Sequence, residues 1–404
     1  MENNDLKLVK EASTEFYIHK KDTNLIPSKS MNVFYNKRMI INRDISSLAI
    51  NAYSTLFKQD ELVVVDSMAA SGIGSIRILK ECKNIKKIYI NDINPEAVKL
   101  IFQNLKLNNL DNRYNQIEIS NKDTNLLFSE IKSNTEKTNK PNIISIDPFG
   151  TPNIYVDSAF KAINKVDGLM CITATDTAVL FGVRPNACYR KYMSKPLHTE
   201  YCKEIGARIL TYFISRIANI NKSRIIPLLT FYSGHFIRAF CLVLKGKRKI
   251  TESFKNYGYI LHCKNCGYRS AFKDNILILP KKCPTCQKID SFDYAGPLWI
   301  GKIHEINFLK EIFSLNKNLN LPSQNRIEKL LSYAIDENYM PFSYYNIHRL
   351  CRDLKIPSIP KLGDIISLIR KKGYQCSRTH FDYLSIKGDM DLFTLRDTIV
   401  ELQK

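Results

Sequence analysis

The sequence lacks any apolar stretch long enough to cross a membrane. Apolar runs such as Leu62–Val65 are far shorter than the roughly 20 residues that a membrane helix needs. Glycine and proline are also scarce, at 15 each among 404 residues, which excludes collagen-like and low-complexity fibres. With 44% hydrophobic and 25% charged residues, the composition predicts a globular chain, and its length suggests two or three domains.

The sequence also lacks an apolar export signal near its start. Residues Met1–Asp5 are polar and acidic, and no hydrophobic segment follows them. We therefore expect a cytoplasmic protein, with a nuclear pool if the source is eukaryotic, and no membrane association. Eleven cysteines in such a compartment do not predict a disulfide framework. No pattern indicates an obligate protein partner.

Acidic residues are in deficit. The sequence has 60 lysines and arginines but only 39 aspartates and glutamates, which gives a net charge of +21. The excess is spread along the chain, because residues 251–404 hold 23 basic and 16 acidic residues. A polyanionic partner would relieve the self-repulsion, and nucleic acid is the leading candidate. The alternative is a compositional bias of the source toward lysine and asparagine.

The first 250 residues alternate between short apolar runs and helical patterns. Five runs predict buried strands, and two later runs predict a closing antiparallel pair. These are residues 62–65, 88–90, 116–119, 142–146 and 169–173, followed by 225–231 and 237–244. Asn94 and Pro95 form a capping pair that opens a helix. The alternation predicts an α/β, doubly wound, Rossmann-like sheet in residues 1–250.

The character changes after the basic stretch Lys245–Lys249. Residues 258–295 are rich in cysteine and turn residues, and residues 304–404 show helical patterns. Helices are expected over residues 306–315, 326–335, 345–354 and 362–371, with a short strand near Tyr374. We therefore predict a second, mainly helical α+β domain in residues 251–404.

A turn of small residues follows the first predicted strand. The segment Asp66-Ser-Met-Ala-Ala-Ser-Gly72 lets a ligand approach the backbone at the carboxyl end of the strand, and Asp92 ends the second strand, where it suits ribose hydroxyls. Arg77 stands where the dinucleotide fingerprint requires its third glycine, which favours S-adenosylmethionine over NAD. Asp123 and Thr124, after the third strand, suit the adenine.

Asp147-Pro-Phe149-Gly follows the fourth predicted strand. A carboxylate can accept hydrogen bonds from an exocyclic amine of a base and later its proton, while an aromatic ring holds the base flat. The pattern therefore predicts Asp147 and Phe149 as catalytic residues of methyl transfer to such an amine. The alternative is an ordinary Asp-Pro turn after a strand.

Four cysteines form two C-x-x-C pairs, Cys263 with Cys266 and Cys283 with Cys286, separated by 16 residues. This spacing is typical of a four-thiolate zinc site, in which the closed shell makes the metal structural rather than catalytic. An iron–sulfur cluster, a redox pair and unliganded thiols are the alternatives. The other seven cysteines are expected to be small buried hydrophobes.

Several ordered blocks between residues 33 and 381 resemble the tRNA (guanine(26)-N2)-dimethyltransferase family. The blocks are Val33–Asn36, Asn42–Asp44, Asp66–Gly72, Asn91–Ile93, Asp147–Gly150, Thr173–Asp176, Arg184–Tyr192, Ser233–Arg238, Gly296–Trp299 and Ser377–Phe381. The resemblance implies methyl transfer from S-adenosylmethionine to the N2 amine of guanine 26 in tRNA, once or twice.

Carried over by residue, the resemblance implies a cofactor contact for Arg43. It places Asp92 at the ribose and Asp123 with Thr124 at the adenine. It makes Asp147 the catalytic carboxylate and Phe149 part of the guanine pocket. The chain departs from the family pattern at Gly74, where members often carry arginine, and Arg77 is the candidate to replace that contact.

Basic and aromatic residues alternate in the C-terminal part. Arg349, Arg352, Lys371, Lys372 and Arg378 occur near Tyr344, Tyr345, Tyr374 and His380. This pattern suits phosphate contact and base stacking. Together with the resemblance, it leads us to expect that residues 304–404 contact tRNA, with residues 345–354, 362–371 and the following tail as a winged-helix-like unit. The alternative is an ordinary helical cap with a solvated basic face. The alternatives to the whole interpretation are an exocyclic-amine methyltransferase of rRNA or DNA and a non-catalytic, zinc-containing RNA-binding protein.

Overall fold

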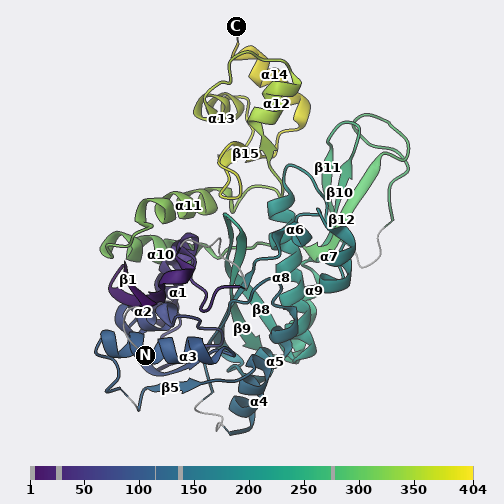
Figure 1. Ribbon diagram of the computed structural model, residues 1–404. Helices are drawn as coiled ribbons and strands as arrows, with labels where there is room; N and C mark the ends of the chain where they lie inside the picture. Colours follow the sequence, from purple (N-terminus) through teal and green to yellow (C-terminus); the bar gives the residue numbers. More distant parts are fainter. Residues whose placement is uncertain (1–4, 24–29, 114, 135–139, 274–277, 404) are drawn as a thin grey trace.

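The computed structural model describes residues 5–23, 30–113, 115–134, 140–273 and 278–403 (Figure 1). A seven-stranded sheet forms its centre, with the order β5-β4-β3-β6-β7-β9-β8. Its strands are β3 (Leu62–Asp66), β4 (Ile85–Asn91), β5 (Ile117–Ser120), β6 (Ile143–Ile146), β7 (Val166–Ala174), β8 (Ser223–Ser233) and β9 (Phe236–Lys245). The first five are parallel, and β9 pairs antiparallel with both β7 and β8. The predicted doubly wound sheet and its closing antiparallel pair are confirmed.

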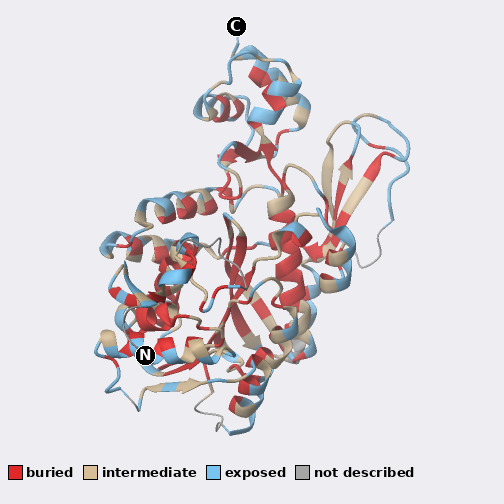
Figure 2. Cartoon of the chain, in the orientation of Figure 1, coloured by how far each residue is buried: buried red, intermediate tan, exposed pale blue. Residues whose placement is uncertain are grey.

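Helices cover both faces of this sheet, so that its central strands are mostly buried, whereas the edge strand β5 is only partly buried (Figure 2). One hydrophobic cluster joins the sheet to α4, α5 and α8, and the other joins it to α1, α2 and α3. Asn94 caps α3 as expected, because its side chain accepts from the amide of Glu96. The helices are α1 (Ile40–Leu56), α2 (Ile73–Glu81), α3 (Pro95–Leu107), α4 (Thr124–Asn134), α5 (Asn153–Ala162), α6 (Thr177–Leu180), α7 (Pro185–Tyr192) and α8 (Cys202–Ile220).

An antiparallel hairpin, β1 (Leu6–Glu11) and β2 (Thr14–His19), packs against α2 and α3. The sequence analysis did not predict this hairpin. Its strands are short, and most side chains of β1 are at least partly exposed, so the apolar alternation that marks a strand is weak there. The hairpin nevertheless brings Glu11, which is 2% exposed, to the amino-terminal end of α1.

A three-stranded sheet follows α9 (Lys247–Phe254). It consists of β10 (Tyr257–Cys263), β11 (Arg269–Phe272) and β12 (Phe292–Trp299) in the order β11-β10-β12. Ile260, Ala295, Leu298 and Trp299 belong to the same hydrophobic cluster as α8. The core is therefore continuous across residue 250.

The last hundred residues form two different parts. Helices α10 (Ile306–Asn318) and α11 (Gln324–Glu337) pack on α1 within the second cluster of the large sheet. The remaining elements enclose a separate core and lie apart at the top of Figure 1. They are β13 (Tyr345–Asn346), α12 (Ile347–Asp353), α13 (Leu362–Lys371), β14 (Cys376–Arg378), β15 (Ser385–Gly388) and α14 (Leu392–Glu401).

The predicted helix over residues 345–354 begins later, at Ile347. Tyr345 and Asn346 instead pair with β15, and the Asn346 side chain caps α12 by accepting from the amide of Arg349. The predicted helix over residues 362–371 is confirmed at both ends. Among the residues that the structure describes, none of the helices has both the length and the apolar character that a membrane crossing requires.

A buried ion cluster, here the Lys387 cluster, joins the C-terminal elements to α8. The Nζ atom of Lys387 lies 3.0 Å from Glu204 Oε2 and 2.9 Å from Glu337 Oε2. Glu337 also accepts from Thr379 Oγ1 at 2.7 Å and from the backbone and ring of His380. Since all of these side chains are buried, the cluster fixes the last elements against α8 by charge pairs, in addition to the apolar packing of Tyr344 and Phe381 in the core of the large sheet.

Candidate functional site

A cavity opens at the carboxyl ends of β3 and β6. These two strands are neighbours in the sheet. After β3 the chain continues toward one edge of the sheet, and after β6 it continues toward the other edge. Doubly wound folds bind ligands between two such strands, and the cavity lies there. Residues from the segment before α1, from α1 itself, from the turn after β3, from the tip of β6 and from β9 line the cavity. They include Phe34, Asn36, Asn42, Arg43, Ser46, Asp66, Ala69, Ala70, Ser71, Gly74, Ser145, Asp147, Pro148, Phe149, Thr175, His235 and Arg238.

Asp66, at the end of β3, presents its carboxyl to the cavity. Burial raises the pKa of Asp66 to about 6, the hydrogen bond from Ser75 Oγ at 2.6 Å opposes this rise, and the negative charge of Asp147 adds to it. A Cβ atom at Gly74 would lie 3.5 Å from Asp66 Oδ2, so the glycine keeps the approach to this carboxylate open. Asp66 is thus a carboxylate that a bound cation would stabilise.

Asp147 lies at the tip of β6, across the cavity. Its Oδ2 accepts a hydrogen bond from Asn42 Nδ2 at 3.1 Å, which orients the carboxyl. Burial raises its pKa, and the positive charge of Arg238 opposes that rise. Arg238 is 2% exposed and donates to Thr173 Oγ1 at 2.7 Å and to Ser145 Oγ at 3.1 Å. The buried guanidinium therefore favours the ionised carboxylate.

Two phenylalanine rings border the Asp147 side of the cavity. Phe149 is 45% exposed, and its ring centre lies 4.4 Å from that of Phe34 in an edge-to-face arrangement. An exposed aromatic ring beside a carboxylate is a surface on which a flat base can lie. The sequence analysis gave no role to Phe34, although it lies within the block Val33–Asn36.

Arg43 reaches the cavity from α1 and is held by Glu11 of the hairpin. Its Nε and Nη2 atoms donate to the two carboxylate oxygens of Glu11 at 2.6 and 2.7 Å. This bidentate pair fixes the guanidinium and leaves 15% of the side chain exposed. Its neighbour in the sequence, Asp44, is fully buried and pairs with Arg77 instead of with Arg43.

Arg77 does not line the cavity. Its side chain is fully buried, with Nη1 at 2.9 Å from Glu11, Nη2 at 2.6 Å from Asp44 and Nε at 2.9 Å from Glu81. The prediction of a cofactor contact does not fit this position, because every face of the guanidinium is engaged by a carboxylate. Arg77 instead centres an ion cluster, here the Arg77 cluster, that comprises Glu11, Arg43, Asp44, Arg77 and Glu81.

The residues predicted for ribose and adenine lie beside the cavity rather than in its lining. Asp92 accepts from the amides of Ala70 at 2.8 Å and Asn94 at 2.9 Å, and so braces the turn after β3. Burial raises its pKa, and these backbone amides oppose the rise. Thr124 is buried and donates to Ser67 O at 3.0 Å, while the exposed Asp123 caps α4 through the amide of Asn125.

His235 and Asn36 also line the cavity and were missed as site residues. Asn36 Nδ2 lies 3.1 Å from His235 Nε2, and Asn36 Oδ1 accepts from the amide of Arg38. With the amide group so oriented, Nδ2 donates to the imidazole, which leaves His235 neutral and protonated at Nδ1. Burial and the charge of Arg38 lower the pKa of His235, in agreement with this state.

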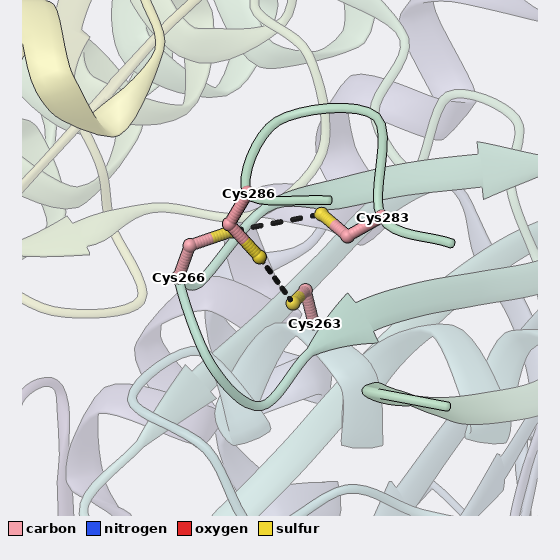
Figure 3. A group of neighbouring side chains, drawn as sticks. All are labelled: Cys263, Cys266, Cys283 and Cys286. Atoms are coloured by element: carbon pink, nitrogen blue, oxygen red, sulfur yellow. Dashed lines mark hydrogen bonds between the residues drawn. The ribbon is translucent and has the colours of Figure 1, made fainter. Parts of the chain in front are cut away.

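The four cysteines of the two C-x-x-C pairs converge at the end of β10 (Figure 3). The Sγ atoms of Cys263 and Cys286 lie 3.7 Å apart, as do those of Cys266 and Cys283. Tetrahedral zinc with Zn–S bonds of about 2.3 Å requires sulfurs about 3.8 Å apart, so the donor set fits this ion. Gly267 and Gln287, each following a second cysteine, take positive φ angles of 75° and 56° that close the two turns.

The fold, with its cavity at the carboxyl ends of β3 and β6, is that of a Rossmann-like methyltransferase. The comparisons identify its family. Residues 14–400 match the family of N2,N2-dimethylguanosine tRNA methyltransferases, and the chain belongs to this family.

Curated relatives and a solved structure cover almost the whole chain. The tRNA (guanine(26)-N(2))-dimethyltransferase of Methanosphaera stadtmanae is 37% identical over 92% of both chains. The enzyme of the same name from Methanobrevibacter smithii is 34% identical over 100% of this chain and 99% of its own. Trm1 from Pyrococcus horikoshii, solved with S-adenosyl-L-methionine, superposes with a TM-score of 0.81 at 29% identity and covers 98% of this chain and 100% of its own.

Proposed function

We propose that this chain transfers methyl groups from S-adenosylmethionine to the N2 amine of guanine 26 in tRNA, with Asp147 as the catalytic carboxylate. The observation that carries the proposal is one cavity that Arg43, Asp66, Asp147 and Phe149 line together. Family membership supports the same activity. The product is the mono- or dimethylated base.

The residues on the β3 side fit S-adenosylmethionine. Asp66 would pair with the ammonium of the methionyl group, and Arg43 with its carboxylate, which accords with the charges that each presents to the cavity. Asp92, next to Ala70, is the candidate for the ribose hydroxyls, and Asp123 with Thr124 for the adenine. When bound, the cofactor supplies an electrophilic methyl group.

On the β6 side the residues act on the guanine amine. The amine lone pair is delocalised into the base, so it is a poor nucleophile until its N–H bonds are accepted. The Asp147 carboxylate, oriented by Asn42, would accept one N–H and take the proton as the new N–C bond forms. Phe149 and Phe34 would hold the extruded base in the plane that this contact requires.

Nucleoside mass spectrometry of tRNA tests this proposal directly. Purified protein, S-adenosylmethionine and unmodified tRNA should yield N2-methylated guanosine at position 26, and a tRNA with adenosine at that position should yield none. Asp147→Ala should abolish product while it keeps S-adenosylmethionine affinity. Asp157→Asn, which removes a surface carboxylate paired with Lys161, is the matched control and should keep full activity. Methylation of rRNA or DNA, or of adenine, in place of position 26 would contradict the proposal.

We further propose that Cys263, Cys266, Cys283 and Cys286 bind one structural zinc ion. The matching sulfur distances support the ion, and the closed shell leaves no position for a substrate. The purified protein should contain about one zinc per chain by mass spectrometry of the native protein. Cys283→Ser should lose the metal and lower thermal stability, whereas Cys351→Ser, in the separate C-terminal core, should keep the metal. An iron–sulfur absorption band would contradict this proposal.

We also propose a functional division near residue 250, with residues 1–250 for catalysis and 251–404 for zinc and tRNA. The second part would comprise residues 258–295, which contain the two C-x-x-C pairs, and residues 304–404, which would contact tRNA. This division is one of function, because the hydrophobic core is continuous across residue 250 and only the elements from β13 to α14 enclose a separate core. Tyr344, Tyr345 and His380 are buried, so they are unsuited to the base stacking expected of them, and other residues must supply it.

A further inference from the structure

One face of α11 and the segment that follows β14 together carry cations and tyrosines. Arg326, Lys329 and Tyr333 are spaced i, i+3 and i+7, which places them on one side of the helix. Arg378, at the end of β14, and Tyr383 lie against this side. These five residues are called the Tyr333 surface.

Aromatic rings hold two of these cations in place. The guanidinium carbon of Arg378 lies 5.4 Å from the centre of the Tyr333 ring. Lys329 Nζ lies 5.9 Å from the Tyr333 ring and 4.6 Å from the Tyr383 ring. The two tyrosine rings are 5.9 Å apart in an edge-to-face arrangement. Cation–π contacts orient a positive charge without neutralising it.

The positive charge of the Tyr333 surface is therefore available to a ligand. Within the described residues, Arg326, Lys329 and Arg378 make no ion pair with a carboxylate, and the Nε of Arg378 is buried without a hydrogen-bond partner. The carboxylate that lies in the adjoining groove, Asp382, is 3.8 Å from Lys203 Nζ and accepts from Asn346. A polyanion would meet uncompensated cations here.

The surface is continuous with the methyl-transfer cavity. Arg326 donates to Ser233 Oγ at 2.7 Å, and Ser233 and Gly234 line a groove together with Arg326 and Tyr383. The next residue, His235, lines the cavity itself. A polynucleotide with one base in the cavity would thus lay its neighbouring nucleotides across this groove.

We propose that the Tyr333 surface binds the tRNA nucleotides that adjoin the target guanine. Arg326, Lys329 and Arg378 contact phosphates, and Tyr383, which is 36% exposed, packs against a base or ribose. This inference rests on the proposed function, because it takes tRNA as the substrate. It assigns part of the tRNA affinity to Arg326, Lys329 and Tyr383, which the alternation of basic and aromatic residues around 344–380 did not single out, and it retains Arg378 from that alternation.

Salt dependence tests the phosphate contacts. Binding of unmodified tRNA, without methyl donor, is measured for Arg326→Gln/Lys329→Gln over a range of salt concentrations. Each lost phosphate contact lowers the log–log slope by roughly 0.7–0.9, so the double variant should lose about 1.4–1.8. The control Lys86→Gln/Lys106→Gln removes the same charge near the opposite edge of the sheet and should keep the slope. Equal slopes for the two double variants would overturn the proposal.

Tyr383 tests the stacking contact. Tyr383→Phe should bind tRNA as the unchanged protein does, whereas Tyr383→Ala should bind about tenfold more weakly with an unchanged salt slope. S-adenosylmethionine affinity should stay unchanged in both, which shows that the cavity is intact. An unchanged tRNA affinity of the Ala variant would refute the stacking role. Because binding is read without methyl transfer, failure of the proposed activity would show separately, as unmodified guanine 26 with the unchanged protein.

Discussion

The molecule contains two buried ion clusters that differ in what they border. The Arg77 cluster lies between the amino-terminal hairpin, α1 and α2, and one of its cations, Arg43, lines the cavity. The Lys387 cluster lies between α8 and the C-terminal elements, and it is sealed from solvent and from the cavity. A buried charge pair can therefore stabilise the fold alone, or it can in addition position a side chain that contacts a ligand.

Removing the centre of the Arg77 cluster should have the largest effect. Arg77→Met would leave Glu11, Asp44 and Glu81 buried with only Arg43 to pair with them, and such a loss costs about 3–5 kcal/mol. Urea unfolding should show this loss, with a smaller one for Arg77→Lys, which keeps the charge. A loss below about 1 kcal/mol would mean that water compensates the carboxylates.

The Lys387 cluster should respond to Glu337→Gln with a smaller loss of stability. Lys387 would keep Glu204 as a partner, so we expect a decrease of about 2–3 kcal/mol in the free energy of unfolding. The affinity for S-adenosylmethionine, measured calorimetrically, should stay unchanged in the folded variant. A weakened cofactor affinity would show that the two clusters are coupled, and so would break the distinction between them.

The sequence predicted the elements that follow local rules. The strands of the large sheet, the Asn94–Pro95 helix start and the convergence of the four cysteines all follow from periodicity, capping preference or ligand spacing. Asp66, Asp147 and Phe149 could be located because each directly follows a strand, and strand ends meet at one edge of a parallel sheet.

The ion clusters could not be predicted in this way. Glu11 and Arg77 are 66 residues apart, and Glu204 and Lys387 are separated by 183, so no local pattern links them. Their carboxylates look like ordinary surface residues in a chain with 25% charged residues. Arg77 was misplaced for the same reason: its nearness to Gly74, where family members often carry arginine, suggested a ligand contact, whereas a distant hairpin supplies one of its partners, Glu11.

Glu11 should connect the Arg77 cluster to cofactor affinity. Glu11→Gln removes the negative charge and one of the two oxygens that accept from Arg43, and we expect S-adenosylmethionine to bind about tenfold more weakly, because the charged bidentate pair that fixes Arg43 is lost. Arg77 keeps Asp44 and Glu81, so stability should fall less than in Arg77→Met.

The matched control is Glu81→Gln, which removes another carboxylate from Arg77 but leaves Arg43 paired with Glu11. Its affinity for S-adenosylmethionine should stay within about twofold of the unchanged protein, since the cavity contact is intact. Equal weakening by both variants would assign the effect to the cluster as a whole and remove the special role of Glu11.

The smallest expected effect is the pH dependence of cofactor binding. The folded-state pKa of Asp66 is raised to about 6 by burial, so the carboxylate that would meet the ammonium is largely ionised at pH 7 and largely protonated at pH 5.5. Affinity for S-adenosylmethionine should therefore fall about fourfold between these values. Asp66→Asn should bind weakly and show a flat profile.

The sign of the stability change follows from the same shift. Because the pKa of Asp66 is raised in the folded state, the cofactor-free protein loses stability as the pH rises through about 6 and this carboxyl ionises. The ammonium of a bound cofactor would offset that loss. Thermal stabilisation by the cofactor should therefore be greater at pH 7 than at pH 5.5. Glu337 should not add to this change, because Lys387 and His380 overcome the effect of its burial and hold its pKa below its ordinary value, so it stays ionised throughout. If the pH dependence persists in Asp66→Asn, another group of the cavity titrates. Asp147, whose pKa is also raised by burial, is the first group to test.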